Sequence, residues 1–268
     1  EVIYLNQIFR QAEESMIVLN AHKINKGCFP EINLPDSDFF FVQRNNPEDT
    51  ASTVIDLSTV RIPDKFGLDP MKDIQVLTPT KKGAAGVFSL NAALQNRLNP
   101  PKAELKEKQL RDMVFRENDR VMQVKNNYGL CWKIYGGNNE VTEGEGVFNG
   151  DMGIITEIDS EEGYITVAFD DGKVCEYGYD MLDELELAYA ITVHKSQGSE
   201  FPAVVMALSG IPPMLTCRNL LYTGVTRACR LVVLVGETNI LKKMVENISE
   251  KKRYTGLAEK LAALPVTL

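Results

Sequence analysis

The spacing of hydrophobic positions changes along the chain and predicts more than one kind of structure. Near the N-terminus, apolar side chains recur at helical spacing, which predicts one amphipathic helix over residues 5–27. Apolar runs of strand length follow at 38–44 and 74–78. A further helix is predicted over 87–98, because the two consecutive prolines that follow it cannot continue a helix.

Between residues 119 and 187 the hydrophobic positions form short alternating runs. RVMQV, GIITEI, YITVAF and KVCEYG are separated by NGD, SEEG and DDG turns. This pattern is typical of a small antiparallel β-barrel. Apolar strands then return at 188–193, 203–207 and 231–236 with predicted helices between them, which is the pattern of an α/β sheet.

These stretches together predict the domain organisation. One α/β domain comprises residues 1–115 and 187–268, and a β-rich insertion comprises residues 116–186. The acidic second half of the insertion, from about residue 157, is interpreted as a solvated face. The chain has 268 residues and 44% hydrophobic composition, so it is long enough to bury a sizeable core.

Charge and cysteine content narrow the possible functions. The formal net charge of −8 predicts that any contact with nucleic acid comes from a local patch and not from the overall field. Five cysteines stand singly and only two histidines occur, so neither a zinc site nor a disulfide framework is expected. The expected location is the reducing cytoplasm. No apolar run approaches the length of a transmembrane helix.

The densest group of candidate functional residues follows the predicted strand 188–193. Four polar residues stand close together there: Thr192, His194, Lys195 and Gln197. The ends of strands in α/β sheets are where such folds place their ligands. Gly198 then permits a close backbone turn, and Glu200 follows it.

A second group follows the predicted strand 74–78, in the sequence LTPTKKGAAGV. Backbone amides in a glycine-rich turn, together with a lysine, can hold phosphate. The spacing of a nucleotide-binding phosphate loop is absent, so Thr78, Thr80, Lys82 and Gly83 are predicted to contact the backbone of DNA. The alternative is an ordinary connection between a strand and a helix.

Arg227 is the third candidate, in the sequence LLYTGVTRA. Its planar guanidinium suits bidentate contact with phosphate and stays charged at all physiological pH values. The alternative for a single arginine is a solvated surface ion pair. Within the insertion, Arg120, Lys125 and Asn126 are predicted to contribute to a small basic edge, whereas its aromatic residues are expected mainly to build the barrel.

The motifs resemble those of RecD-like helicases, which form the 5′-to-3′ branch of superfamily 1 and include the exodeoxyribonuclease V alpha subunit. The segments IFRQAEES, VLTPTKKGAAGV, FRENDRVMQ, VFNGDMG, AITVHKSQGSEF and LLYTGVTRA occur in the order found in that family. The resemblance implies a RecA-like parallel-sheet motor domain, called domain 2A. It also implies an inserted SH3-like barrel, called domain 2B.

The resemblance further implies a function for these residues. Arg10 and Arg227 would be catalytic and would sense the γ-phosphate of ATP, with Gly198 and Glu200 completing the ATP contacts. The segment around His194 would line a single-stranded DNA channel. No G-x-x-x-x-G-K-[ST] loop occurs in the sequence, so an N-terminal motor domain of the same protein is expected to supply that loop and the Mg²⁺ ligands.

The expected partners are single-stranded DNA, ATP, that N-terminal motor domain, and recombination or repair proteins. Without the first motor domain, this stretch is expected to hydrolyse no ATP. Two alternatives stay open. The chain could be the motor portion of a conjugative relaxase-helicase, or a non-catalytic DNA-binding or docking module that keeps the helicase fold.

Overall fold

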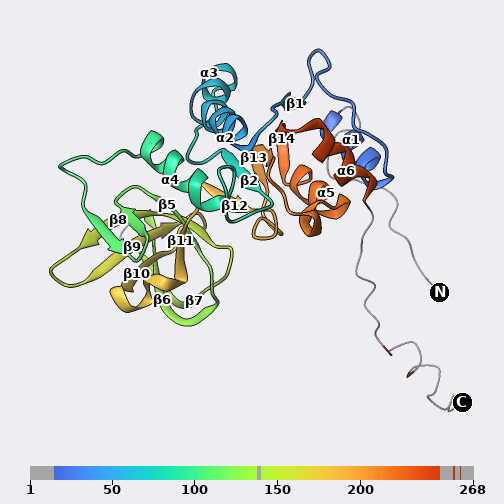
Figure 1. Cartoon of the computed structure of the whole chain (residues 1–268). Helices are drawn as coiled ribbons and strands as arrows, with labels where there is room; N and C mark the ends of the chain where they lie inside the picture. The colour runs from blue at the N-terminus through green and yellow to red at the C-terminus, as the bar shows by residue number, and fades with distance from the viewer. Residues whose placement is uncertain (1–14, 138–139, 248–255, 257–259, 261–268) are drawn as a thin grey trace, which may run out of the picture.

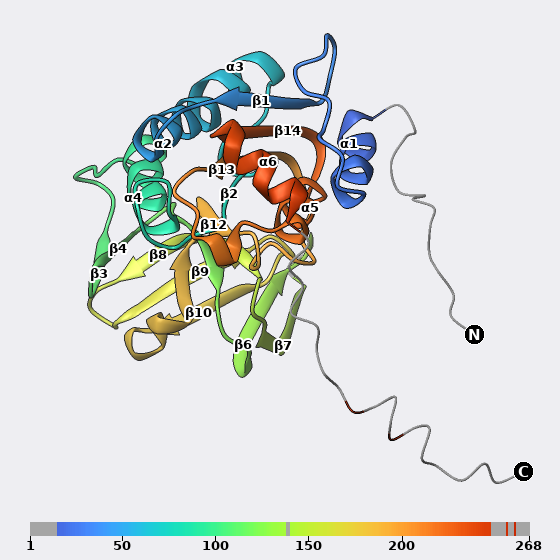
Figure 2. The ribbon, with the colours of Figure 1, turned by 45° about the vertical axis from the view of Figure 1, so that its right-hand side comes forward.

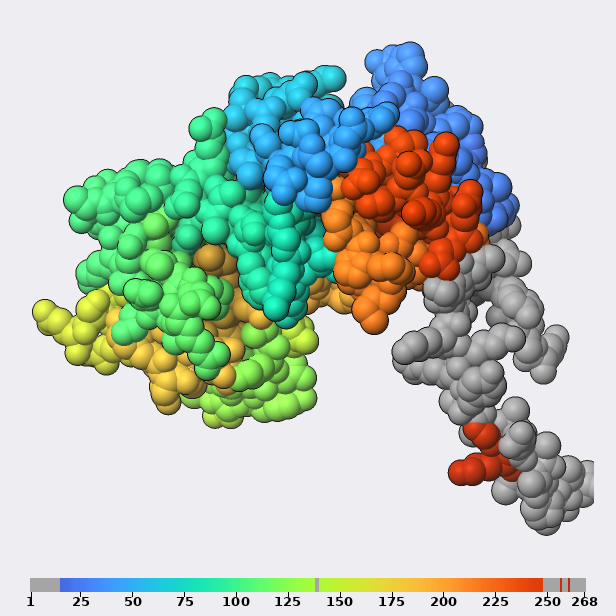
Figure 3. Space-filling model, viewed as in Figure 1, coloured from blue at the N-terminus to red at the C-terminus, as the bar shows by residue number. Residues whose placement is uncertain are grey.

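The computed structural model describes residues 15–137 and 140–247, together with residues 256 and 260 (Figure 1). It contains two main β-structures, besides a two-stranded hairpin of β3 (Glu107–Leu110) and β4 (Met113–Arg116). Arg10 and the first part of the predicted helix over 5–27 lie outside the described residues. One β-structure is a parallel sheet with helices on both faces. The other is an antiparallel barrel, which lies against one end of the parallel-sheet body (Figure 3).

The parallel sheet has five strands in the order β1-β14-β13-β2-β12, and all four pairings are parallel. Its strands are β1 (Phe39–Gln43), β2 (Ile74–Thr78), β12 (Ala190–Thr192), β13 (Phe201–Leu208) and β14 (Ala228–Gly236). Every residue of β2 is buried and β13 is buried almost throughout, because helices cover both faces of the sheet. The predicted strands are thus confirmed, with bounds that differ by up to three residues.

Helices cover the two faces of the parallel sheet in separate groups (Figure 2). One face carries α1 (Met16–Asn25), α5 (Arg218–Val225) and α6 (Thr238–Glu246). The other face carries α2 (Pro47–Asp56), a π-helical turn (Leu57–Arg61), α3 (Ile62–Phe66) and α4 (Val87–Leu98). The bounds of α4 agree with the helix predicted over 87–98. Within the described residues, no helix is long and apolar enough to cross a membrane.

The insertion forms a seven-stranded antiparallel sheet in the order β11-β5-β8-β9-β10-β6-β7. Its strands are β5 (Arg120–Gln123), β6 (Asn127–Tyr135), β7 (Val141–Val147), β8 (Met152–Asp159), β9 (Tyr164–Phe169), β10 (Val174–Gly178) and β11 (Leu185–Leu187). Buried and half-buried residues alternate along β9, as expected for a strand with one face toward a core. The fold class is therefore the predicted one: a parallel-sheet domain with a small inserted barrel.

A buried carboxylate joins the two structures. Asp119 accepts hydrogen bonds from the side chains of Gln95 and Asn99, at 2.6 and 2.8 Å, and from the Tyr189 hydroxyl at 2.8 Å. The backbone N–H of Arg116 donates to it as well, at 2.7 Å. Burial raises the pKa of Asp119, and these four hydrogen bonds oppose the rise. The carboxylate thus connects α4, the start of the insertion and the segment that returns from it.

Candidate nucleotide and nucleic-acid site

The predicted DNA-binding residues follow the carboxyl ends of two neighbouring strands. β2 pairs with β12 so that Thr78 lies opposite Thr192, and the Val193 N–H donates to the Thr78 carbonyl at 3.2 Å. The short strand β12 is held in place by α4, where Asn91 exchanges hydrogen bonds with the backbone of Ala190 at 2.8 and 2.9 Å. Both groups of predicted residues therefore emerge at one edge of the sheet.

The loop after β2 exposes two lysines, Lys81 and Lys82, and a glycine, while its threonines stay buried. Thr78 is 1% exposed and its hydroxyl donates to the Ala85 carbonyl at 2.8 Å. The Thr80 carbonyl accepts from the Val87 N–H at 3.0 Å. Lys82 and Gly83 lie at the exposed tip, where Gly83 has a φ of +93°. The threonines thus shape the loop, and the tip is what faces solvent.

The segment after β12 turns back on itself directly after the strand. The backbone N–H groups of Lys195 and Ser196 donate to the Thr192 carbonyl at 2.9 and 3.3 Å, and the buried Ser196 hydroxyl donates to Val193 at 2.7 Å. His194 and Gln197 are exposed. Gly198 has a φ of +91°, a conformation that a residue with a Cβ rarely adopts.

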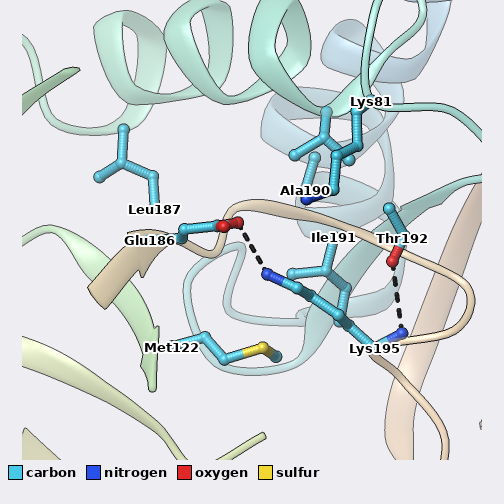
Figure 4. A pocket seen from close by; sticks show the side chains of 9 residues that line it. Lys81, Met122, Glu186, Leu187, Ala190, Ile191, Thr192 and Lys195 are labelled. Carbon is cyan, nitrogen blue, oxygen red and sulfur yellow. Dashed lines mark hydrogen bonds and ion pairs between the residues drawn. The ribbon is translucent and has the colours of Figure 1, made fainter. Parts of the chain in front are cut away.

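Lys195 differs from its exposed neighbours because it has an ionic partner. Its ammonium lies 2.7 Å from a carboxylate oxygen of Glu186, on the last strand of the barrel (Figure 4). The two side chains are 22% and 29% exposed. Lys81 and Thr192 line the same depression. Sequence reasoning missed Lys81 and Glu186, although a glutamate shortly before the strand and a second lysine beside Lys82 were both visible.

Arg227 lies at the opposite edge of the sheet, between α5 and β14. Its guanidinium donates to the carbonyls of Thr223 and Ser199, at 3.2 and 3.0 Å, and to the Thr226 hydroxyl at 3.3 Å. The Phe201 N–H donates to the Arg227 carbonyl at 2.8 Å. These contacts place Arg227 next to the segment that carries Gly198 and Glu200, at the amino ends of β13 and β14.

Glu200 faces a cleft of about 320 Å³ between the parallel sheet and the barrel. Ser199 and Arg120 line the same cleft, and the Cys229 thiol lies 3.8 Å from the Glu200 carboxylate. Within the described residues there is no group of three or more His, Cys, Asp or Glu side chains that could hold a metal ion.

The two barrel residues predicted to bind DNA both have hydrogen-bond partners within the barrel. Arg120 is 6% exposed and makes a bidentate ion pair with Asp170, at 2.6 and 2.5 Å, so the structure does not place it on an exposed basic edge. Asn126 is exposed, and its side-chain oxygen accepts from the Asn149 N–H at 2.9 Å. Lys125 pairs with Asp183, which leaves little net positive charge there.

Charge is distributed very unevenly between the two parts of the chain. The insertion, residues 116–186, contains 17 acidic and 5 basic residues and so has a net charge of −12. The rest of the chain contains 24 basic and 20 acidic residues, a net charge of +4. A phosphate backbone is therefore attracted to the parallel-sheet part and repelled by the barrel.

Two families of known sequences match parts of the chain. The family of ATP-dependent RecD-like DNA helicase SH3 domains matches residues 90–169. The family of UvrD-like helicase C-terminal domains matches residues 187–235, which carry Lys195, Glu200 and Arg227. The fold and these matches together define the class of the chain, which is the C-terminal region of a superfamily 1 helicase.

Two curated relatives place the chain more closely. It is 32% identical over 231 residues to the ATP-dependent RecD2 DNA helicase of Deinococcus radiodurans, a match that covers 84% of this chain and 27% of that protein. It is 33% identical over 141 residues to the RecBCD enzyme subunit RecD of Mycolicibacterium smegmatis, a match that covers 53% of this chain and 22% of that protein. The chain belongs to the RecD-like helicases, and it spans about a quarter of the length of these relatives.

One solved structure shows the same fold. The chain is similar to a Pif1 helicase from Bacteroides, crystallised in complex with ADP-AlF3 and single-stranded DNA, with a TM-score of 0.50 and 20% sequence identity. The similarity covers 97% of this chain and 56% of that one. It extends over both the parallel sheet and the barrel, which supports the assignment of the fold.

Proposed function

We propose that this chain is the second motor half of an ATP-dependent 5′-to-3′ DNA helicase of the RecD type. In this proposal it binds single-stranded DNA at the carboxyl edge of β2 and β12. At the amino edge of β13 and β14 it supplies Arg227 to an ATP site that it shares with an N-terminal motor domain. Membership of the RecD-like family supports the activity class.

One structural observation carries the proposal. The segment 193–200 starts at the predicted DNA edge, next to Thr192, and ends at the predicted ATP edge, where the Ser199 carbonyl accepts from Arg227 at 3.0 Å. The pairing of β13 with β2 shows that the two ends of the sheet are about six residues apart along β13, which corresponds to about 20 Å. Because one short segment contacts both edges, a movement at the nucleotide is passed directly to the DNA contacts.

The chemistry that Arg227 would perform is charge stabilisation. In phosphoryl transfer, negative charge spreads over the oxygens of the transferred group, and an arginine from a second domain stabilises it, by about 10³-fold or more in rate. The guanidinium is already oriented by three acceptors and loses little further freedom on binding phosphate. Arg10, which lies outside the described residues, is proposed as its partner on the strength of the family resemblance.

Mg²⁺ is the metal implied by this reaction, where it would neutralise charge on the β- and γ-phosphate oxygens. The described residues offer no cluster of three or more candidate ligands. We assign the magnesium ligands and the phosphate loop to the N-terminal motor domain. This chain's own contribution is then limited to Arg227, Arg10, Gly198 and Glu200.

The test is the substitution Arg227→Ala in a protein that joins this chain to the N-terminal motor domain. We expect DNA-stimulated ATP hydrolysis to fall at least 10³-fold, while affinity for single-stranded DNA changes less than about twofold, because Arg227 lies at the other edge of the sheet. Arg230→Ala is the matched control, since Arg230 is an exposed arginine on the same strand. Near-normal ATPase in Arg227→Ala would contradict the proposed role of Arg227.

A further inference from the structure

We propose that Lys81, Thr192 and Lys195 form a subsite for one phosphate of the DNA backbone, and that Glu186 of the barrel occupies it when DNA is absent. This inference rests on the proposed function, because it assigns a new contact to the same DNA-binding edge. Glu186 acts here as a gate: it holds Lys195 until a phosphate replaces its carboxylate.

The geometry of the depression supports a phosphate subsite. Two lysines and a threonine converge on it from two loops, after β2 and after β12, and Figure 4 shows Lys195 extended toward Glu186 across its floor. The Lys195 N–H donates to the Thr192 hydroxyl at 3.3 Å, which holds this hydroxyl at the start of the turn that carries Lys195. Lysines, a hydroxyl and backbone amides are the groups that proteins use to bind phosphate.

Glu186 is positioned by the barrel and not by the motor domain. It lies on β11, which pairs antiparallel with β5 so that Glu186 is opposite Met122. Its carboxylate lies 2.7 Å from the ammonium of Lys195, which belongs to the turn after β12. The most acidic part of the chain thus places one carboxylate at the centre of a basic site.

Competition between carboxylate and phosphate follows from the ion pair itself. The Glu186 carboxylate lies 2.7 Å from the Lys195 ammonium, so a phosphate that contacts this ammonium competes with the carboxylate for it. The ion pair is partly exposed, and such pairs contribute little free energy. A phosphate that contacts both Lys81 and Lys195 can therefore replace the Glu186 carboxylate. An anion that contacts Lys195 alone gains much less binding free energy.

The experiment measures binding of a fluorescent oligothymidylate to the 268-residue chain by anisotropy over a series of salt concentrations. Glu186→Gln should bind about fivefold more tightly at low salt, the effect of removing one unit charge close to a phosphate in water. Glu176→Gln is the matched control, because it removes the same charge from an exposed position on β10. In the background of Lys195→Gln, the Glu186→Gln substitution should give no more than a small gain.

Several outcomes overturn the gate. An unchanged affinity in Glu186→Gln would do so, and so would an equal gain in Glu176→Gln, which would mean that only the overall charge of the barrel matters. If the chain and every variant fail to bind at low salt, the DNA-binding part of the proposed function fails together with the gate. Binding without a Glu186 effect leaves the proposed function intact and removes the gate alone.

A second measurement does not depend on affinity for DNA. Reductive methylation, followed by mass spectrometry, reports how readily each lysine amine reacts. Lys195 should react several-fold faster in Glu186→Gln than in the parent chain, while Lys82 at the loop tip should react at the same rate in both. Added oligothymidylate should then protect Lys195. Equal reactivity of Lys195 in the two proteins would show that Glu186 does not hold it.

Discussion

Substitution of Asp119 by alanine should loosen the attachment of the barrel to the parallel-sheet domain. Asp119 is fully buried and accepts four hydrogen bonds from three parts of the chain. Gln95 and Asn99 come from α4, Arg116 from the start of the insertion, and Tyr189 from the segment that follows it. Alanine would leave all four donors without this acceptor inside a packed core.

The expected loss of stability follows from counting these donors. A buried donor left unsatisfied costs about 1–3 kcal/mol. Gln95 and Asn99 keep a second acceptor each, Val114 and Glu117, so each of them loses one of two contacts. Removing a buried carboxylate also removes its desolvation cost, which offsets part of the loss. We therefore expect Asp119→Ala to lower the free energy of unfolding by about 3 kcal/mol.

The chain supplies separate probes for its two parts. Trp132 is the single tryptophan and lies on β6, so its fluorescence reports the barrel. The α-helices of the described residues all lie outside the insertion, so far-UV circular dichroism near 222 nm mainly reports the parallel-sheet domain. In urea, Asp119→Ala should unfold earlier by fluorescence than by dichroism. Asp112→Ala, at an exposed turn, is the control.

A loss below about 1 kcal/mol, with coincident transitions by both probes, would refute this reasoning. It would mean that water or rearranged side chains satisfy the donors once the carboxylate is gone. Tyr189→Phe removes only one donor and leaves the carboxylate in place. It should therefore cost less than Asp119→Ala, and the reverse order would also contradict the role given to the carboxylate.

Two further predictions concern pH and the lysine loop. Burial raises the pKa of Asp119 in the folded chain. The contribution of this group to stability is therefore greatest below its unfolded pKa of about 3.9 and is lost as the pH rises through its folded pKa. In urea unfolding between about pH 4 and 8, the stability of the parent chain should decline relative to that of Asp119→Asn. Gly86→Ala should lower stability by about 2 kcal/mol in thermal unfolding and weaken oligothymidylate binding, because the added Cβ would lie 2.5 Å from the Lys82 carbonyl oxygen. Gly129→Ala is the control, because open space surrounds Gly129, and it should change neither stability nor binding. Equal effects of the two substitutions would contradict the clash proposed at Gly86.

The elements that sequence predicted well are those with a strong and regular hydrophobic pattern. β2 and α4 have the predicted bounds, and the alternation within the insertion correctly indicated an antiparallel barrel. Fully buried strands read as unbroken apolar runs, and β13 and β14 are of this kind from residues 203 and 231 onward. The hydrophobic pattern did not predict which strands pair with β13 and β14, because this depends on how the helices pack on each face of the sheet.

Other elements carried local signals that the hydrophobic pattern did not show. The helical stretch from Pro47 to Phe66 buries threonines and a serine as well as apolar residues, so it has no clear apolar stripe. Its start was nevertheless readable: Asn46 caps the helix by accepting from the Asp49 N–H at 2.7 Å, with proline at the first helical position. The hairpin over residues 107–116 has short strands with mixed burial and no comparable signal.

The functional residues were predictable as a set but not in their arrangement. Sequence motifs selected Thr192, Lys195, Glu200 and Arg227, and the structure divides them between two edges of one sheet. The ion pairs of Arg120 and Lys195 join residues that are 50 and 9 positions apart. Such pairs are decided by the folding of the barrel onto the sheet, which no local pattern records.

The barrel's acidity gives these contacts a common consequence. With a charge of −12 the insertion repels a DNA backbone, yet it is packed against the edge where DNA is proposed to bind. Asp119 fixes the start of the insertion to α4, and Glu186 at its end holds Lys195. DNA that displaces Glu186 therefore acts on the barrel, and a shift of the barrel acts on Lys195. This reciprocity follows from linkage: if Glu186 weakens binding about fivefold, bound DNA weakens the Glu186–Lys195 contact by the same factor.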